Sequence, residues 1–143
     1  MNKLTYIDNN QLDHFILRKI LSRYGIPIEV KCADSCKEVL SQMMNDSTEK
    51  ENMPDIIFLD IYSAEFDAWE FLDKLQLLYP AFAKPVEIYI LSALRFQTDL
   101  DRLKQYDLVK AFIMKPITKE VLQQLLKQRE LPESRFTMIE ALN

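Results

Sequence analysis

The sequence predicts an α/β protein in which five β-strands alternate with helices around one parallel sheet. Short apolar runs alternate along the chain with longer segments whose apolar residues have helical spacing. The chain has 143 residues, of which 48% are hydrophobic and 28% are charged, as expected for one globular domain. Its single glycine, Gly25, excludes the glycine-rich phosphate loops of P-loop and dinucleotide-binding folds.

Composition also limits the partners that we expect. The formal net charge is -4 and no long basic run is present, which argues against nucleic acid as a partner. No apolar stretch reaches the roughly 20 residues that span a bilayer, and the apolar run in "MNKLTYIDNN" is too short for a secretion signal. Cys32 and Cys36 fit structural cysteines in a reducing compartment. We therefore expect a cytoplasmic protein with no membrane partner.

The first predicted unit pairs a short strand with an amphipathic helix. Leu4 to Asp8 is apolar with a β-branched and aromatic bias, as in strands. The helix runs from Gln11 to Tyr24, where Asn10 can cap its start and Gly25 can close its end. His14 has no evident partner in the sequence, so we expect it to face solvent.

The second and third units differ in how deeply their strands are buried. "IEVKCA" alternates apolar and polar residues, as an edge strand does, and Ser35 can cap a helix with Val39, Leu40 and Met43 inward. "DIIFLDI" is nearly continuous in apolar residues, which predicts a strand buried on both faces. The helix that follows spans Asp67 to Tyr79.

The fourth and fifth units complete the pattern. "VEIYILS" is the fourth strand, followed by a short polar helix from Thr98 to Tyr106 whose only anchors are Leu100 and Leu103. "VKAFIM" is the fifth strand and runs into Lys115 and a proline. A last helix starts at Thr118.

The chain is expected to divide into a domain and a short extension. The last predicted helix ends at about Gln128, so we assign residues 1–129 to the domain and 130–143 to a C-terminal extension. Ser134 to Leu142 can form a short amphipathic helix. Two alternatives stay open: the extension docks onto its own domain, or it binds a partner.

Strands alternating with helices pair in parallel through right-handed crossovers. Five such units most economically give the flavodoxin-like (βα)5 fold, a doubly wound parallel five-stranded sheet in the order 2-1-3-4-5. Ligands of such sheets bind beyond the carboxyl ends of the strands, between the first and the third. Asp8 ends the first predicted strand and Asp60 ends the third, so we expect their carboxylates to meet there.

The residues at this edge suit phosphoryl chemistry. Two adjacent carboxylates repel unless a cation lies between them, and Mg²⁺ commonly takes one or two carboxylates together with phosphate oxygens. An aspartate beside the metal can act as a nucleophile towards phosphorus. Lys115 and the Ser92 hydroxyl, at the ends of the last two strands, would supply the cation and the donor that a transferred phosphoryl group needs.

Five motifs, "YIDNN", "IIFLDI", "FDAWEFL", "YILSA" and "IMKPI", occur in an order and at a spacing that carry a family resemblance. The chain resembles the receiver domain of two-component response regulators, of the chemotaxis-regulator kind. This resemblance implies that Asp60 accepts a phosphoryl group, with Ser92 as the hydroxyl switch residue, Phe112 as the aromatic switch residue and Lys115 as the phosphate-pairing lysine. It implies Mg²⁺ ligation by Asp8, by Asp60 and by the backbone carbonyl of Tyr62.

The same resemblance implies how such a chain works. A histidine kinase or phosphotransfer protein would donate the phosphoryl group, and the phosphorylated chain would signal to an unknown downstream protein. The new charge would draw Ser92 inward and let Phe112 turn in. The chemistry would be self-catalysed phosphotransfer and autodephosphorylation at most, not that of a stand-alone metabolic enzyme.

Two positions depart from the family pattern. The acidic pair usually has two carboxylates, whereas Asn9 follows Asp8 here, so we expect Asn9 to ligate Mg²⁺ weakly and metal binding to be weaker. Tyr62 is bulky and could shield the acyl phosphate from water. The alternative is a pseudo-receiver, an interaction module that is not phosphorylated because Asn9 and Tyr62 alter its pocket. A phosphatase of the haloacid dehalogenase type would need an Asp in place of Tyr62.

Overall fold

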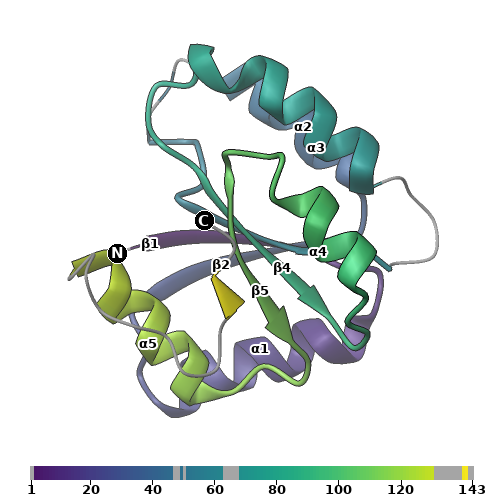
Figure 1. The fold of residues 1–143 in the computed structure, drawn as a ribbon. Helices are drawn as coiled ribbons and strands as arrows, with labels where there is room; N and C mark the ends of the chain where they lie inside the picture. Colours follow the sequence, from purple (N-terminus) through teal and green to yellow (C-terminus); the bar gives the residue numbers. More distant parts are fainter. Residues whose placement is uncertain (1, 47–48, 50, 63–67, 131–139, 142–143) are drawn as a thin grey trace.

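The computed structural model describes residues 2–46, 49, 51–62, 68–130 and 140–141 of the chain. Strands and helices alternate from the N-terminus onwards (Figure 1). The strands are β1 (Asn2–Ile7), β2 (Ile28–Ala33), β3 (Ile56–Asp60), β4 (Glu87–Ser92), β5 (Val109–Met114) and β6 (Glu140–Ala141). The helices are α1 (Gln11–Arg23), α2 (Cys36–Asp46), α3 (Ala68–Leu78), the short 3₁₀ helix η1 (Tyr79–Ala81), α4 (Gln97–Leu103) and α5 (Lys119–Glu130).

The sheet confirms the predicted topology. Its order is β2-β1-β3-β4-β5-β6, and the first five strands of this row pair in parallel. The order of these five strands is therefore 2-1-3-4-5, that of a flavodoxin-like doubly wound sheet. None of the described helices is long and apolar enough to cross a bilayer.

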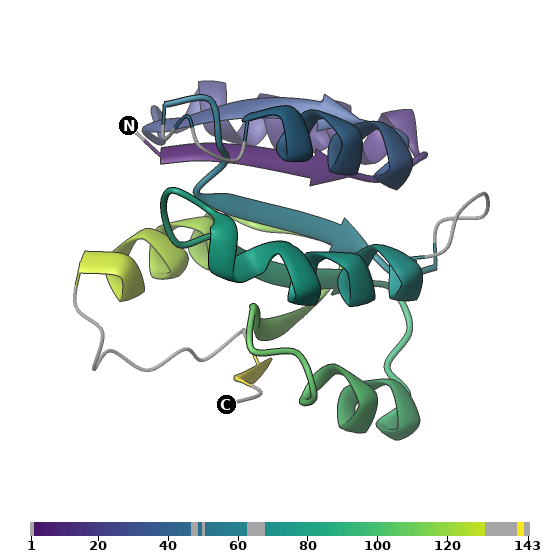
Figure 2. The ribbon, with the colours of Figure 1, turned by 90° about the horizontal axis from the view of Figure 1, so that it is seen from above.

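Helices cover both faces of the sheet, and each face has its own apolar core. Figure 1 shows α2 and α3 on one side of the sheet and α1 and α5 on the other, and Figure 2 shows the layers from above. Alternate residues of β3 divide between the two cores, as the two-residue period of a strand requires. Ile57 belongs to the core under α2, α3 and α4, whereas Phe58 belongs to the core under α1 and α5.

The ends of the helices largely follow their local sequence. The Asn10 side chain caps α1 as predicted, and Gly25 adopts a φ of +58° after the helix end, a backbone conformation that favours glycine. The polypeptide continues past α3 into η1, because Pro80 fits the first turn of such a helix. The fourth helix, α4, starts one residue earlier than predicted and ends at Leu103.

The C-terminal extension is described only at Glu140 and Ala141. These two residues form β6, which pairs antiparallel with β5 in the register Phe112↔Glu140 and Ala111↔Ala141. An extended backbone at these two positions differs from the helix predicted for Ser134 to Leu142. The rest of that segment lies outside the described residues, so the helix and the domain boundary at residue 129 stay predictions.

Candidate functional site

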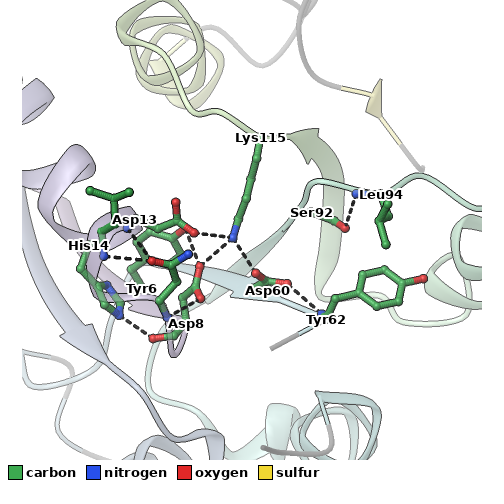
Figure 3. Close-up of polar contacts among 11 residues, drawn as sticks. Tyr6, Asp8, Asp13, His14, Asp60, Tyr62, Ser92, Leu94 and Lys115 are labelled. Carbon is green, nitrogen blue, oxygen red and sulfur yellow. Dashed lines mark hydrogen bonds and ion pairs between the residues drawn. The ribbon is translucent and has the colours of Figure 1, made fainter. Parts of the chain in front are cut away.

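Side chains from two strand ends, from α1 and from the loop after β5 meet at the carboxyl edge of the sheet (Figure 3). The ammonium group of Lys115 lies at their centre. Its Nζ donates to Asp8 Oδ2 at 2.8 Å, to Asp13 Oδ2 at 2.7 Å and to Asp60 Oδ2 at 2.6 Å. We call these four residues the acid pocket.

The strand register explains why these residues meet. Ile7 of β1 lies opposite Leu59 of β3, so Asp8 and Asp60 are the next residues on two adjacent parallel strands. Lys115 follows β5 directly, and its backbone N–H donates to the Ser92 carbonyl oxygen at 2.9 Å. Parallel strands end at the same edge of a sheet, and this edge therefore collects both acids and the lysine.

Further hydrogen bonds hold the two strand-end carboxylates. Asp8, of which 1% is exposed, accepts the Tyr6 hydroxyl at Oδ2, 3.0 Å away, and the Asn10 backbone N–H at Oδ1, 2.9 Å away. Asp60 Oδ1 accepts the Tyr62 backbone N–H at 2.8 Å. Both acids therefore have fixed orientations, because each carboxylate is held through both of its oxygens.

These contacts shift the ionisation of the groups in the pocket. Burial raises the pKa of Asp8, but the hydrogen bonds from Lys115 and from the Asn10 N–H outweigh it and hold that pKa below its ordinary value. Burial lowers the pKa of Lys115, but hydrogen bonds to Asp13, Asp60 and Asp8 together raise it well above its ordinary value. The pair of Asp8 and Lys115 therefore stays charged near neutral pH.

The two predicted switch residues lie beyond the acid pocket on β4 and β5. Ser92 is fully buried, and its Oγ accepts the Leu94 backbone N–H at 3.0 Å. Figure 3 places Ser92 between Lys115 and Leu94, on the side of Asp60 away from Asp8. Phe112 is 2% exposed and belongs to the same apolar core as Leu103. Its ring is therefore buried, and a phenylalanine has no hydroxyl that would favour solvent.

The two departures from the family pattern have different surroundings. Asn9 follows Asp8 directly and is partly exposed. The Tyr62 side chain is 43% exposed, and its hydroxyl donates to Asp99 Oδ2 of α4. Its ring meets that of Phe96 edge to face, with 6.1 Å between the centroids. In Figure 3 the ring points away from Lys115.

The sequence reasoning missed two residues of this site. Asp13 was not singled out, although it lies in the first turn of α1, whose start Asn10 fixes beside the end of β1. The expectation for His14 was wrong, because this side chain is only 5% exposed. Its Nε2 donates to the Asp8 carbonyl oxygen at 2.6 Å, and its ring packs edge to face on Tyr6. The helical period from Leu17 and Leu21, which are also buried, could have indicated this.

The donor set of the acid pocket fits a hard divalent cation. The carboxylates of Asp8, Asp13 and Asp60 offer oxygen atoms that all lie within 4.8 Å of one another. Mg²⁺ prefers carboxylate oxygens and keeps several of its own water molecules, so it needs few protein ligands. The three acids together can therefore hold such an ion.

Comparison with solved structures identifies the fold. A two-component response regulator from Legionella pneumophila has a TM-score of 0.77 and 18% identity, over 91% of this chain and 98% of its own. One from Cytophaga hutchinsonii has a TM-score of 0.76 and 20% identity, over 90% and 96%. The Mn²⁺-bound form of response regulator Rcp1 has a TM-score of 0.66 and 14% identity, over 96% and 99%.

Comparison of sequences adds no relative. No protein-family model matches the chain, and no curated protein matches it significantly. The assignment therefore comes from the sheet order, the helices on both faces and the structural neighbours together. The chain has the receiver-domain fold of the two-component response regulators.

Proposed function

We propose that the chain is a response regulator receiver domain that accepts a phosphoryl group on Asp60 and signals through protein contacts. The observation that carries this proposal is the environment of the Asp60 carboxylate. One of its oxygens accepts the Lys115 ammonium at 2.6 Å and the other accepts the Tyr62 N–H at 2.8 Å. A carboxylate held in this way, 11% exposed at the carboxyl edge of a parallel sheet, is oriented for attack on a small anion.

The transfer itself needs little covalent chemistry from the protein. A carboxylate oxygen of Asp60 forms a bond to phosphorus as the bond from phosphorus to the donor histidine nitrogen breaks, and the imidazole leaves. Lys115 would balance the negative charge of the phosphoryl oxygens, and the Ser92 hydroxyl would donate a hydrogen bond to them. A histidine kinase or phosphotransfer protein in the cytoplasm would be the donor.

A bound Mg²⁺ would supply further positive charge at the phosphoryl oxygens. Asp8, Asp60 and the backbone carbonyl of Tyr62 would hold it, with the amide oxygen of Asn9 as a weaker ligand. The neighbour Rcp1, which has the same fold, was solved in a Mn²⁺-bound form, and this supports a divalent ion as a ligand of the fold.

The phosphoryl group would act on the region around α4 and the loop that precedes it. Ser92 precedes the loop to α4, and Phe112 lies in the core on which α4 packs. Because Phe112 is buried in that core, we expect the response to involve the loop and α4 that pack around it. The downstream protein would bind the surface around α4 and β5.

The rival function is a pseudo-receiver that binds partners without phosphorylation. Asn9 favours it, because this position lacks the second carboxylate of the acidic pair. The intact set of Asp8, Asp60 and Lys115, joined by direct contacts, favours the phosphorylated receiver.

Beryllofluoride, which mimics an aspartyl phosphate, separates the two functions. With Mg²⁺, we expect the amide NMR signals of Asp60, Ser92 and Leu94 to shift in the wild-type chain and to stay unchanged in Asp60→Asn. Unchanged spectra in the wild-type chain, together with a response in Asn9→Asp, would instead establish the pseudo-receiver.

A further inference from the structure

The most informative residue that the proposed function leaves unused is Asp13. The Asn10 side chain accepts hydrogen bonds from the Leu12 N–H at 2.9 Å and the Asp13 N–H at 3.4 Å, which places Asp13 in the first turn of α1. From there its Oδ2 reaches Lys115 Nζ at 2.7 Å, as close as the two strand-end acids do. Its side chain is 23% exposed, so it lies at the solvent side of the pocket.

The charge of the pocket shows what Asp13 adds. The residues identified from the sequence are two carboxylates and one ammonium, with a sum of -1. Asp13 brings the sum to -2, which is the charge that the pocket would have with an aspartate at position 9 and none at position 13. The neutral Asn9 therefore does not leave the pocket with a weaker negative charge.

Two roles are open to an acid at this place. A carboxylate that only tethers Lys115 would stabilise the pocket and have little effect on a divalent ion. A carboxylate that belongs to the cation site would set the affinity for the ion, because its oxygen lies within 4.8 Å of ligand oxygens of both Asp8 and Asp60. Three contacts to one ammonium already require such a spacing, so the spacing fits both roles. The charge of the pocket favours the second role, because Asp13 restores the acidic charge that a divalent cation needs there.

We propose that Asp13, from the first turn of α1, supplies the second acidic charge that position 9 lacks and so sets the affinity of the pocket for Mg²⁺. This inference rests on the proposed function, because the ion matters as part of phosphoryl transfer at Asp60. It replaces the expectation of weak metal binding with one of ordinary binding through a carboxylate from a different element of the fold.

Calorimetric titration of the full chain with Mg²⁺ tests this role directly. We expect Asp13→Asn to weaken Mg²⁺ binding by about 10-fold or more, as loss of a charged group at a metal site commonly does. Asn9→Asp introduced into Asp13→Asn should return the affinity to within a few-fold of wild type. Asp34→Asn is the matched control, because Asp34 is an exposed acid that follows β2 at the same edge of the sheet. This substitution removes the same charge as Asp13→Asn.

A second readout follows the ion itself. Mn²⁺, which is paramagnetic, should broaden the amide signals of Asp8, Asp13 and Asp60 in the wild-type chain at lower concentrations than in Asp13→Asn. Urea unfolding without metal shows that each variant is folded, and we expect Asp13→Asn to fold because it relieves repulsion among three acids.

The outcomes separate this inference from the proposed function. Mg²⁺ affinity that is unchanged in Asp13→Asn, or lowered no more than in Asp34→Asn, would overturn the role of Asp13 and leave phosphorylation of Asp60 intact. A wild-type chain that fails to bind Mg²⁺ would overturn it as well. Asp13-dependent Mg²⁺ binding without any beryllofluoride response would uphold the inference and contradict the receiver function.

Discussion

The acid pocket and the region around α4 lie at the same edge of the sheet but are held in very different ways. In the acid pocket, one ammonium is bonded to three carboxylates, and the Asp8 and Asp60 carboxylates each accept a backbone N–H as well. The helix α4 has only seven residues and two buried side chains, Leu100 and Leu103. Beside it, Leu94 is 49% exposed and Phe96 is 50% exposed.

This contrast is what the proposed receiver function would need. Groups that bind an anion need fixed positions, because a misplaced charge loses most of its effect. An element that reports the binding needs alternative positions of similar free energy, and few buried contacts provide them. We call α4 with Tyr62, Leu94 and Phe96 the α4 side, and the following predictions break or sharpen its contrast with the acid pocket.

The largest expected effect is on the acid pocket when its cation is removed. Lys115→Met leaves three carboxylates facing one another, so we expect the free energy of unfolding in urea to fall by about 3 kcal/mol. Mg²⁺ should restore part of this loss and should bind the variant more tightly, because the competing ammonium is gone.

Lys110→Met is the control for that change. Lys110 is exposed on β5 and its Nζ donates to the Asp107 carbonyl oxygen. Its substitution should therefore change the free energy of unfolding by no more than about 0.5 kcal/mol. Equal stability of the Lys115 and Lys110 variants would mean that the acid pocket is not the constrained region that its contacts indicate.

A smaller effect is expected when an anchor of α4 is shortened. Leu103→Ala removes a fully buried side chain, so we expect the free energy of unfolding to fall by about 2 kcal/mol. This value is near the lower end for such substitutions, because a short helix can relax into the space that is left. Amide exchange of residues 97–103 should rise more than that of β3. A uniform rise across the sheet would show that α4 is not a separately mobile element.

The pH dependence of stability should also come mainly from the acid pocket. The pKa of Asp8 is lowered from 3.8 by folding, so its stabilisation is present above that pH and is lost as the pH falls further. The pKa of Lys115 is raised above 10.5, so its contribution is present below that pH and is lost as the pH rises. Urea unfolding between about pH 9 and 11.5, the range in which lysine side chains titrate, checks this. Over that range Lys115→Met should lose less of its free energy of unfolding than the wild-type chain does.

The smallest effect is expected for the contact that joins the two regions. Tyr62→Phe removes the hydroxyl that donates to Asp99 and keeps the ring in contact with Phe96. We therefore expect the free energy of unfolding to fall by about 0.5 kcal/mol. Amide exchange at the start of α4 should increase, while Mg²⁺ affinity stays unchanged. A change in Mg²⁺ affinity would show that Tyr62 acts on the acid pocket itself and not only on α4.

Much of this organisation is readable in the sequence, because strand ends in a parallel sheet have a fixed relation. The positions of Asp8, Asp60 and Lys115 follow from the apolar runs that precede them, and all three meet as predicted. Asp13 was not predicted and the prediction for His14 was wrong, since the roles of both depend on how α1 is rotated against β1. The position of a residue at a strand end can be predicted from the strand pattern alone. The position of a helix residue can be predicted only when the packing of the whole helix is known.

The C-terminal extension was unpredictable for another reason. A pair of residues such as Glu140 and Ala141 has no periodicity of its own, and its strand exists only through hydrogen bonding to β5. Such a partner is not visible in the local sequence.

The most direct test of the account is phosphoryl transfer from acetyl phosphate in the presence of Mg²⁺, followed by mass spectrometry of the intact chain and of its peptides. We expect the wild-type chain to gain one phosphoryl group, mapped to Asp60, only when Mg²⁺ is present, and Asp60→Asn to gain none. A wild-type chain that folds and binds Mg²⁺ but gains no phosphoryl group, or gains it at another residue, would contradict the account.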